Sequence, residues 1–371
     1  METMENSNSV VFDKLALEHG GMLATNGHAL YQSRDVIMDC LDKMLRCSNT
    51  LRPLITVADI GTADGSTSLV LCNEIIEKVR KYHKQIMIHY TDLPDNDFNR
   101  MFSIIQEGLR RGPDVFSAAI GRSMFKQCLP DQSTDLIFSS VAAMNLSKRL
   151  RRPNINQSPD QSNENEVKAL KTLAALDWKT FLVMRGRELR PGGYLVVLNI
   201  GTTKYGETTV NIHGGKATLD QILKTMLADG LITMNEFLDC SSCSLVERTE
   251  TEHIAPFKEN DKDLEETGLE LVSIRSFVHQ LKHPTFYVSN KDEATKKLYA
   301  DRIVAGIKPW LYNSIYRGLS SERSTSEREI LVEKYFANLW DFAYKNNDQI
   351  PHLALVEIVA KRRQRQSLKT K

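Results

Sequence analysis

The sequence lacks the features that mark membrane-spanning, secreted and nucleic-acid-binding proteins. Its longest apolar runs, such as Tyr194–Ile200, have the length of a strand and fall far short of the roughly 20 residues that cross a bilayer. The N-terminal stretch METMENSNSVVFDK has neither the basic start nor the apolar centre of a signal peptide. A formal net charge of +1 gives no overall attraction to nucleic acids or membrane surfaces. We therefore expect no nucleic-acid and no membrane partner.

Cysteine is scarce, with six residues in a chain of 371, and the six follow no regular spacing. That pattern argues against a disulfide framework and favours reduced thiols in a cytoplasmic protein. Cys240 and Cys243 form one C-x-x-C pair. A zinc site needs further ligands, and the sequence has neither a second C-x-x-C nor a paired histidine motif to provide them. We therefore expect no metal.

The sequence does contain a regular alternation of apolar strands and amphipathic helices. With 41% hydrophobic and 26% charged residues, its composition is that of an ordinary globular protein, and its length suits a core with an elaboration. Strands are expected at residues 55–60, 86–92, 115–120, 135–139 and 194–200, and helices at residues 69–79, 98–109 and 165–189. This alternation predicts an α/β sheet with right-handed crossovers, which binds its ligands at the carboxyl ends of the strands.

The stretch YTDLPDNDFNRMF (residues 90–102) combines a strand, a turn and the start of a helix. Pro94 cannot continue a strand, and the two residues after it suit a turn. Asp97 is a good N-cap for a helix whose apolar residues recur at helical spacing, namely Phe98, Met101, Phe102, Ile105 and Leu109. The strand before the turn is therefore expected to end at Asp92.

The second half of the chain is mostly helical in pattern, with helices expected at residues 218–229, 261–267, 291–305 and 327–344. Two strands interrupt it, at residues 269–278 and 353–359. We interpret this half as helices inserted between the last strands, which form a lid over the ligand edge of the sheet. The polar segment 151–166 is expected to be a surface loop, and the basic tail 361–371 a solvated terminus.

The first strand runs into DIGTADGSTS (residues 59–68), which places an acid where a dinucleotide-binding protein would bring a pyrophosphate. The glycines follow Asp-x-Gly-x-x-x-Gly rather than Gly-x-Gly-x-x-Gly. A carboxylate at Asp59 would repel phosphate and favour a cationic ligand such as S-adenosylmethionine, which carries an amino group and a sulfonium. Asp92, at the end of the second strand, suits the two hydroxyls of a ribose. The alternative is that both acids only cap helices.

Four motifs, in this order, resemble those of the SABATH methyltransferases, the plant-type enzymes that methylate the carboxyl groups of salicylate, jasmonate and indole-acetate. The motifs are VADIGTADG (residues 57–65), YTDLPDNDFNRMF, SSVAAMNLS (residues 139–147) and FLVMRGRELRPGGYLVV (residues 181–197). The resemblance spans most of the chain and is weakest in the lid. It implies an α/β, class I methyltransferase (Rossmann-like) sheet with helices on both faces and a helical lid in the C-terminal half.

The resemblance also implies a division of the chain into three parts. Residues 1–50 would be an N-terminal helical segment that contributes to the active site, and residues 51–205 the Rossmann-like cofactor-binding core. Residues 206–371 would be a helical lid interleaved with the last strands of the core sheet. S-adenosyl-L-methionine would be the cofactor, bound by Asp59, Gly61 and Thr67 at its methionine end, Asp92 at the ribose, Leu93, Ser123 and Met124 beside the adenine, and Ser139 close to the transferred methyl.

For the acceptor, the resemblance implies an S-adenosylmethionine-dependent O-methyltransferase that forms methyl esters of a small-molecule carboxylic acid. Such an acid is already ionised at neutral pH, so catalysis needs alignment in a dry pocket rather than a general base. The stretch GHALYQSRDVI places the carboxylate-binding glutamine of the family at Gln32, and the tryptophan of the family falls on Asn145. Asn145 still offers two N–H donors, and Met144 matches a methionine of the acceptor pocket. The alternatives are a turn residue at Asn145 and ordinary core packing at Met144.

Departures from the family pattern keep other functions open. Val141 replaces an aromatic residue, and segment 235–244 lacks the Asn and Pro that contribute to a magnesium site in some members, so no metal is expected. These changes, with Asn145, suggest a pocket suited to an aliphatic acid. Trp310, Tyr312 and Tyr316 are candidates for replacement aromatic surface from the lid, with helix packing as their alternative. Two other functions remain, an N-methyltransferase of a small heterocycle and a non-catalytic relative that only binds the cofactor. The resemblance also allows a homodimer.

Overall fold

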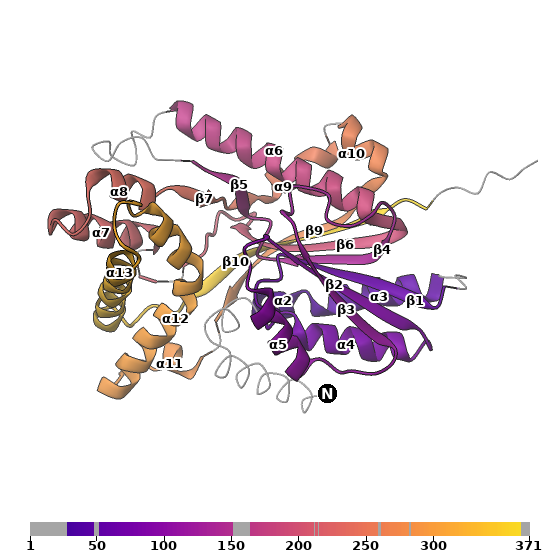
Figure 1. Ribbon diagram of the computed structural model, residues 1–371, viewed down its shortest axis with the longest axis horizontal. Coiled ribbons are helices and arrows are strands. Elements are labelled where there is room, and N and C mark those ends of the chain that lie inside the picture. Colours follow the sequence, from indigo (N-terminus) through magenta and orange to yellow (C-terminus); the bar gives the residue numbers. More distant parts are fainter. Residues whose placement is uncertain are drawn as a thin grey trace, which may run out of the picture.

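The structure is a computed structural model that describes residues 28–47, 52–150, 164–210, 212–213, 215–258, 261–281 and 283–364 (Figure 1). One twisted sheet lies at its centre with helices on both faces, and a further group of helices lies beyond one end of the strands. This arrangement confirms the predicted α/β fold and the helical region in the C-terminal half.

The sheet carries its strands in the order β3-β2-β1-β4-β6-β10-β9. Their bounds are β1 (Leu54–Ile60), β2 (Gln85–Asp92), β3 (Val115–Gly121), β4 (Thr134–Ser140), β6 (Leu189–Thr202), β9 (Leu269–Gln280) and β10 (His352–Arg362). The neighbouring strands β3, β2, β1, β4 and β6 pair in parallel, whereas β10 runs antiparallel between β6 and β9. The chain builds outward from β1 to β3 and then returns to add β4 on the other side. The carboxyl ends of β1 and β4 therefore form the switch point where α/β proteins bind ligands.

Two hydrophobic cores hold the helices on the sheet. On one face, α3 (Arg34–Cys47), α4 (Leu69–Arg80) and α5 (Phe98–Gly108) pack on β1, β2 and β4. On the other face, α6 (Glu164–Glu188) and α10 (Lys262–Thr267) pack on β1, β4, β6 and β10, with α9 (Glu250–Lys258) beside them. Burial on both faces explains the continuous apolar runs of these strands, and it leaves their carboxyl ends as the open edge.

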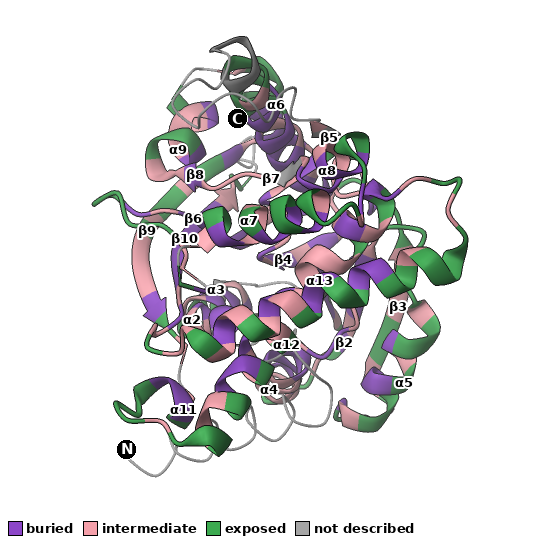
Figure 2. Cartoon of the chain, turned by 90° about the vertical axis from the view of Figure 1, so that its left-hand side faces the viewer, coloured by how far each residue is buried: buried purple, intermediate pink, exposed green. Residues whose placement is uncertain are grey.

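The helical group, which we call the lid, consists of α7 (Gly215–Ala228), α8 (Met234–Cys240), α11 (Pro284–Tyr287), α12 (Glu293–Gly318) and α13 (Thr325–Lys345). These helices share a hydrophobic core of their own. Thr233 and Glu236 form a capping box at the start of α8, and the guanidinium of Arg323 holds the pKa of Glu236 down to about 2. Figure 2 views the lid from its outer side, with α7, α12 and α13 in front of the sheet.

Four short elements complete the described chain. Helix α2 (His28–Gln32) precedes α3, and β8 (Arg248–Thr249) pairs in parallel with the end of β6. Strands β5 (Asn145–Leu150) and β7 (Cys243–Leu245) form a separate antiparallel pair between the sheet and the lid. Within the described ranges, no helix is long and apolar enough to cross a membrane.

Element types agree with the sequence more closely than element bounds do. The strand predicted at residues 194–200 begins earlier, at Leu189, so β6 includes Gly192, which has a φ of 86° and lies where the register to β4 shifts. Helix α12 continues past the predicted end at residue 305, through Pro309, because both of its halves pack into the lid core. The predicted loop at residues 151–166 lies outside the described residues except for its last three, which begin α6.

Candidate active site

A cleft of about 700 Å³ opens between the carboxyl ends of β1, β2 and β4 and the lid helix α12. The loop after β1, the β2–α5 junction and the segments after β3 and β4 line its core side, and one face of α12 lines its lid side. A volume of this order accommodates a nucleotide-sized cofactor together with part of a small acceptor. The cleft therefore lies at the switch point of the sheet.

Asp59 lies at the base of the cleft and is only 5% exposed. The hydroxyl of Thr62 donates to Asp59 Oδ2 at 2.9 Å. Burial raises the pKa of Asp59 to about 6, and the nearby charge of Asp92 adds to the rise. Among the described residues no lysine, arginine or histidine pairs with it. A buried carboxylate in this situation gains from a cationic ligand group placed beside it.

Asp92 positions the loop after β1 and also faces the cleft. Its Oδ2 accepts the backbone N–H of Ala63 at 2.7 Å, and its Oδ1 accepts that of Leu93 at 2.7 Å. Asn96 Nδ2 donates to the carbonyl of the same Ala63 at 2.8 Å. Burial raises the pKa of Asp92, and the two backbone donors oppose that rise. Each carboxylate oxygen keeps lone-pair capacity for a ligand hydroxyl, so Asp92 fits a vicinal diol.

Gly61 is the point where the loop after β1 meets the segment after β4. Its φ is 80°, and a Cβ at this position would lie 2.2 Å from the Cβ of Ala142. Its N–H donates to Thr91 O at 2.8 Å, which fixes the loop on the end of β2. Only glycine fits this backbone and this contact, and the floor of the cleft depends on both.

The structure brings most of the predicted cofactor residues into this one cleft, whose lining includes Asp59, Gly61, Thr67, Asp92, Leu93, Ser123 and Met124. Leu93 is 48% exposed, so it presents an apolar surface that suits an adenine ring. Ser139 is the exception, because it is 1% exposed and its hydroxyl donates to Ile60 O at 2.8 Å. Ser139 therefore ties β4 to β1, and the neighbouring Ser140 is the serine that lines the cleft.

Residues 141–147, which we call the acceptor segment, form the wall after β4. Asn145 lines the cleft, while its Nδ2 donates to Ala142 O at 2.9 Å and its backbone N–H donates to the same carbonyl at 3.0 Å. Asn145 is thus a turn residue and a cleft residue at once, and its second amide N–H is left for a ligand. Met144 is 1% exposed and packs in the core with Leu198 and Leu353, away from the lining.

Val141 and Trp310 form an apolar part of the cleft wall. Val141 has a φ of 57°, a rare conformation for a β-branched residue, and its N–H donates to Leu198 O at 2.6 Å. Trp310 of α12 packs against the cluster that contains Val141 and Met144, and it lines the cleft. The lid therefore supplies an aromatic surface beside the residue that replaces the aromatic of the family pattern.

Gln32 lies at the end of α2, and its backbone carbonyl accepts a hydrogen bond from Arg275 Nη2 at 3.2 Å. The α2 residue in the described lining of the cleft is Leu30 rather than Gln32. The structure therefore does not bring Gln32 and Asn145 together in this cleft, and a role of Gln32 at the acceptor stays a prediction.

The sequence analysis missed the polar face that α12 turns to the cleft, with Asn313, Ser314 and Arg317 next to Trp310. These residues follow Trp310 by three, four and seven positions, which is the spacing of one helix face. Arg317 Nη2 pairs with Asp95 Oδ2 at 2.7 Å, so an ion pair joins the lid to the β2–α5 junction at the cleft rim. The spacing was visible in the sequence, but nothing local showed that this face meets the strand ends.

Comparison with known proteins agrees with the fold and the cleft. The family model described as SAM dependent carboxyl methyltransferase matches residues 24–260. A benzoic acid/salicylic acid carboxyl methyltransferase of Petunia hybrida is 29% identical over 199 residues, which are 48% of this chain and 55% of that protein. Paraxanthine methyltransferase 2 of Arabidopsis thaliana is 30% identical over 161 residues, 38% of this chain and 44% of that protein. The chain thus aligns with about half the length of these curated relatives.

Among solved structures, a loganic acid methyltransferase with SAH superposes with a TM-score of 0.67 at 20% identity, and the match covers 94% of this chain and 97% of that one. The fold is therefore that of a class I methyltransferase. The chain belongs to the SAM-dependent carboxyl methyltransferase family, as the resemblance to SABATH enzymes predicted. S-adenosylmethionine is the methyl donor of this family. The cleft suits this cofactor because Asp59 and Asp92 line it and Gly61 forms part of its floor.

Proposed function

We propose that this protein transfers a methyl group from S-adenosylmethionine to the carboxylate of a small-molecule acid. The observation that supports this most strongly is the pair of acids at the ends of neighbouring parallel strands, the buried Asp59 and the half-buried Asp92. Asp59 lies where a cationic group would be stabilised, and Asp92 presents lone pairs suited to a ribose. The family of the chain and the benzoic acid/salicylic acid enzyme of Petunia hybrida support a carboxylic acid as acceptor.

The chain performs this reaction by positioning. S-adenosylmethionine, held by Asp59 and Asp92, would supply an electrophilic methyl on its sulfonium. A carboxylate oxygen of the acid would form a bond to that methyl carbon as the C–S bond breaks, and the electron pair of that bond would stay on the departing sulfur. The acid is ionised at neutral pH, so no side chain has to remove a proton. Asp59 and Asp92 hold the cofactor, the free amide N–H of Asn145 orients the acid, and Val141 and Trp310 exclude water from the reacting atoms.

Cofactor affinity is expected to depend on pH through Asp59. The pKa of this carboxyl is about 6 in the free protein, so ionised Asp59 costs folding stability as pH rises from about 4 to 6, and a bound cation offsets that cost. Below pH 6 the carboxyl must lose a proton before it can bind the cation. Titration calorimetry with S-adenosylmethionine should therefore show an affinity that is constant above pH 7 and falls by up to about 10-fold per pH unit below pH 6.

Asp59→Asn is the control. We expect this variant to bind S-adenosylmethionine weakly, with an affinity that does not change between pH 5 and pH 8. Three other titratable groups face Asp59, namely Asp92, Cys72 and Tyr90. Burial holds the pKa of Cys72 at about 12 and that of Tyr90 above its usual value, so both stay neutral in this range. A pH slope that survives in Asp59→Asn would assign the titration to Asp92 instead.

Asn145→Ala should raise the Michaelis constant for the acid about 5- to 10-fold, since the acceptor loses one charge-assisted hydrogen bond, with little change in cofactor affinity. Gln32→Ala is the companion variant. A comparable rise with Gln32→Ala would place α2 over the bound acid, as the family pattern predicts. An unchanged constant in Asn145→Ala would remove this residue from the proposed site.

The acceptor class is tested by transfer of radiolabelled methyl to separate sets of aromatic acids, aliphatic acids and neutral heterocycles. Label that mild base releases from an acid would establish ester formation. Two observations favour N-methylation of a heterocycle as the second candidate, namely the amide at Asn145 and the similarity to a paraxanthine methyltransferase. That function predicts base-stable label on a heterocycle. Cofactor binding without any transfer is the outcome expected of the non-catalytic alternative.

Compartment and assembly belong to the same proposal. Three described cysteines, Cys40, Cys72 and Cys128, are buried free thiols, which supports a reducing compartment such as the cytoplasm. The homodimer stays a prediction, and light scattering of the purified chain would test it.

A further inference from the structure

Two buried arginines contact the segments that form the cleft, although neither arginine belongs to its lining. Arg185 is 0% exposed and Arg248 is 2% exposed. Both direct guanidinium N–H groups at backbone carbonyls of cleft-forming segments. Burying a guanidinium costs desolvation free energy, and even a buried ion pair can often be replaced by apolar residues of similar volume without loss of stability. Their contacts therefore call for an explanation other than packing.

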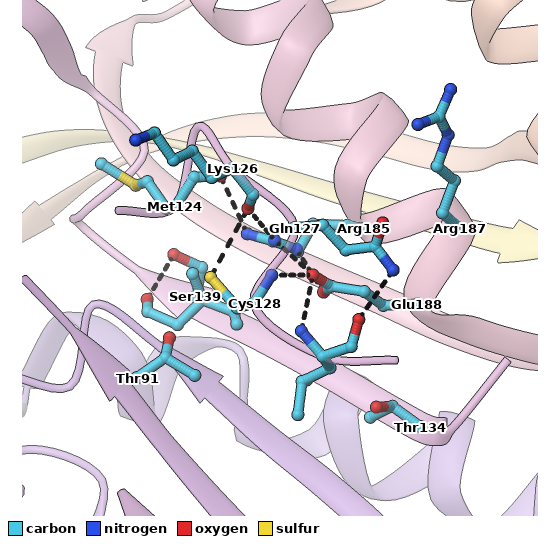
Figure 3. A network of polar contacts seen from close by, with 12 residues as sticks. Thr91, Met124, Lys126, Gln127, Cys128, Thr134, Ser139, Arg185, Arg187 and Glu188 are labelled. Carbon is cyan, nitrogen blue, oxygen red and sulfur yellow. Dashed lines mark hydrogen bonds and ion pairs between the residues drawn. The ribbon is translucent and has the colours of Figure 1, made fainter. Parts of the chain in front are cut away.

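Arg185 holds residues 121–129, which we call the cofactor loop because Ser123 and Met124 line the cleft. Arg185 Nη1 donates to Met124 O and Nη2 to Lys126 O, each at 3.0 Å. Glu188 pairs with Arg185 through two contacts of 2.7 Å. Figure 3 shows this network, in which Glu188 also accepts a backbone N–H from the far end of the loop, at Cys128. One ion pair thus fixes the loop through both its carbonyls and its amides.

Arg248 holds the acceptor segment in a comparable way. Its Nη1 donates to Ala143 O at 3.0 Å, while Nη2 and Nε donate to Ala174 O of α6 at 2.9 and 3.2 Å. Burial lowers the pKa of Arg248 to about 10, so it stays charged at neutral pH. No ion pair joins it to a carboxylate within the described chain. Asp177, one helical turn along α6, accepts the N–H of Ser147 at 2.7 Å, so α6 anchors the acceptor segment at two points.

We propose that Arg185 and Arg248 are positioning residues with separate tasks, Arg185 for the cofactor loop and Arg248 for the acceptor segment. Both act through backbone carbonyls, so their effect is on the placement of Met124 and Asn145 rather than on ligand contact. Helix α6 is the common support, since it carries Arg185 and supplies the Ala174 carbonyl to Arg248. A misplacement of about 1 Å in a site that works by alignment can cost about 100-fold in rate, which gives such anchors a function.

The test compares Arg185→Lys with Arg248→Lys, because each keeps the charge and loses the planar fork that reaches two carbonyls. Arg323→Lys is the matched control, since Arg323 binds Glu236 and Leu231 O in the lid. Hydrogen–deuterium exchange should accelerate about 10-fold in residues 121–129 for Arg185→Lys only, and in residues 141–147 for Arg248→Lys only. Titration with S-adenosylmethionine should give about a 10-fold weaker affinity for Arg185→Lys and less than a twofold change for the other two.

A third readout, the Michaelis constant of the best acid in the panel, should rise about 10-fold for Arg248→Lys and stay within twofold for Arg185→Lys at saturating cofactor. Only this readout rests on the proposed function, because it requires methyl transfer to an acid. If the wild-type protein were inactive, hydrogen–deuterium exchange and cofactor titration would still test the proposal. If a variant does not fold, the double variant Arg185→Met with Glu188→Gln, or Arg248→Met, replaces it. Equal changes of both segments in both variants, or exchange that matches Arg323→Lys, would overturn the division of tasks.

Discussion

Gly61→Ala should destabilise the protein by about 2–5 kcal/mol and abolish measurable binding of S-adenosylmethionine. The expected loss has two parts. Alanine at a φ of 80° costs about 1–2 kcal/mol in backbone strain. Its Cβ would also lie 2.2 Å from that of Ala142, and overpacking of this kind costs about 1–3 kcal/mol. The clash pushes the loop after β1 away from the segment after β4, so the floor of the cleft opens. Urea unfolding and titration calorimetry measure the two effects.

Gly206→Ala separates the two parts, because Gly206 has a φ of 85° and nothing lies within 4 Å of a Cβ there. It should show only the backbone cost. Combining Gly61→Ala with Ala142→Gly removes the clashing methyl and leaves the nearest atom at 3.7 Å, so part of the stability and cofactor affinity should return. If Gly61→Ala costs no more than Gly206→Ala, the close contact is not what shapes the cleft.

The sequence analysis was most successful where chemistry and local structure coincide. Asp59 and Asp92 each follow an apolar strand, and parallel strands place their carboxyl ends at one edge, so two acids far apart in sequence could be assigned to one site. The N-cap at Asp97 was visible for the same reason, and its side chain accepts the N–H of Arg100 at 2.9 Å. The role of a residue that ends a strand or begins a helix can therefore be assigned from the local sequence alone.

The analysis was less successful where a role depends on contacts between distant segments. Ser139 and Ser140 are adjacent and chemically identical, yet only the second lines the cleft. Successive side chains of a strand point to opposite faces of the sheet, and the hydroxyl of Ser139 donates to Ile60 O of β1. The role of Arg248 could not be predicted from local sequence, since its hydrogen-bond partners lie 74 and 105 residues away in the chain. The polar face of α12 could be read as a helix face but not assigned to the cleft. Such assignments require the packing of the lid on the sheet.

Asp92→Ala should weaken binding of S-adenosylmethionine by about 1–3 kcal/mol, the usual cost of a lost hydrogen bond to a charged group. The structure adds a second effect to this prediction. Asp92 accepts the backbone N–H groups of Ala63 and Leu93, so its removal should also cost up to about 1–3 kcal/mol of folding stability through unsatisfied donors. Asn96→Ala is the matched control. It frees the carbonyl of the same Ala63 without removing a carboxylate, so it should loosen the loop with a smaller loss of affinity.

The ribose assignment can be separated from the loop effect by comparing S-adenosylhomocysteine with its 2′-deoxy analogue. Wild-type protein and Asn96→Ala should both bind the analogue more weakly, because a ligand without the hydroxyl leaves a lone pair of the half-buried Asp92 without its donor. In Asp92→Ala that preference should disappear, since the carboxylate that distinguishes the two ligands is gone. The coupling in this cycle should be about 1 kcal/mol or more for residues in direct contact. A preference that persists in Asp92→Ala would mean that another group holds the ribose and that Asp92 only shapes the loop after β1.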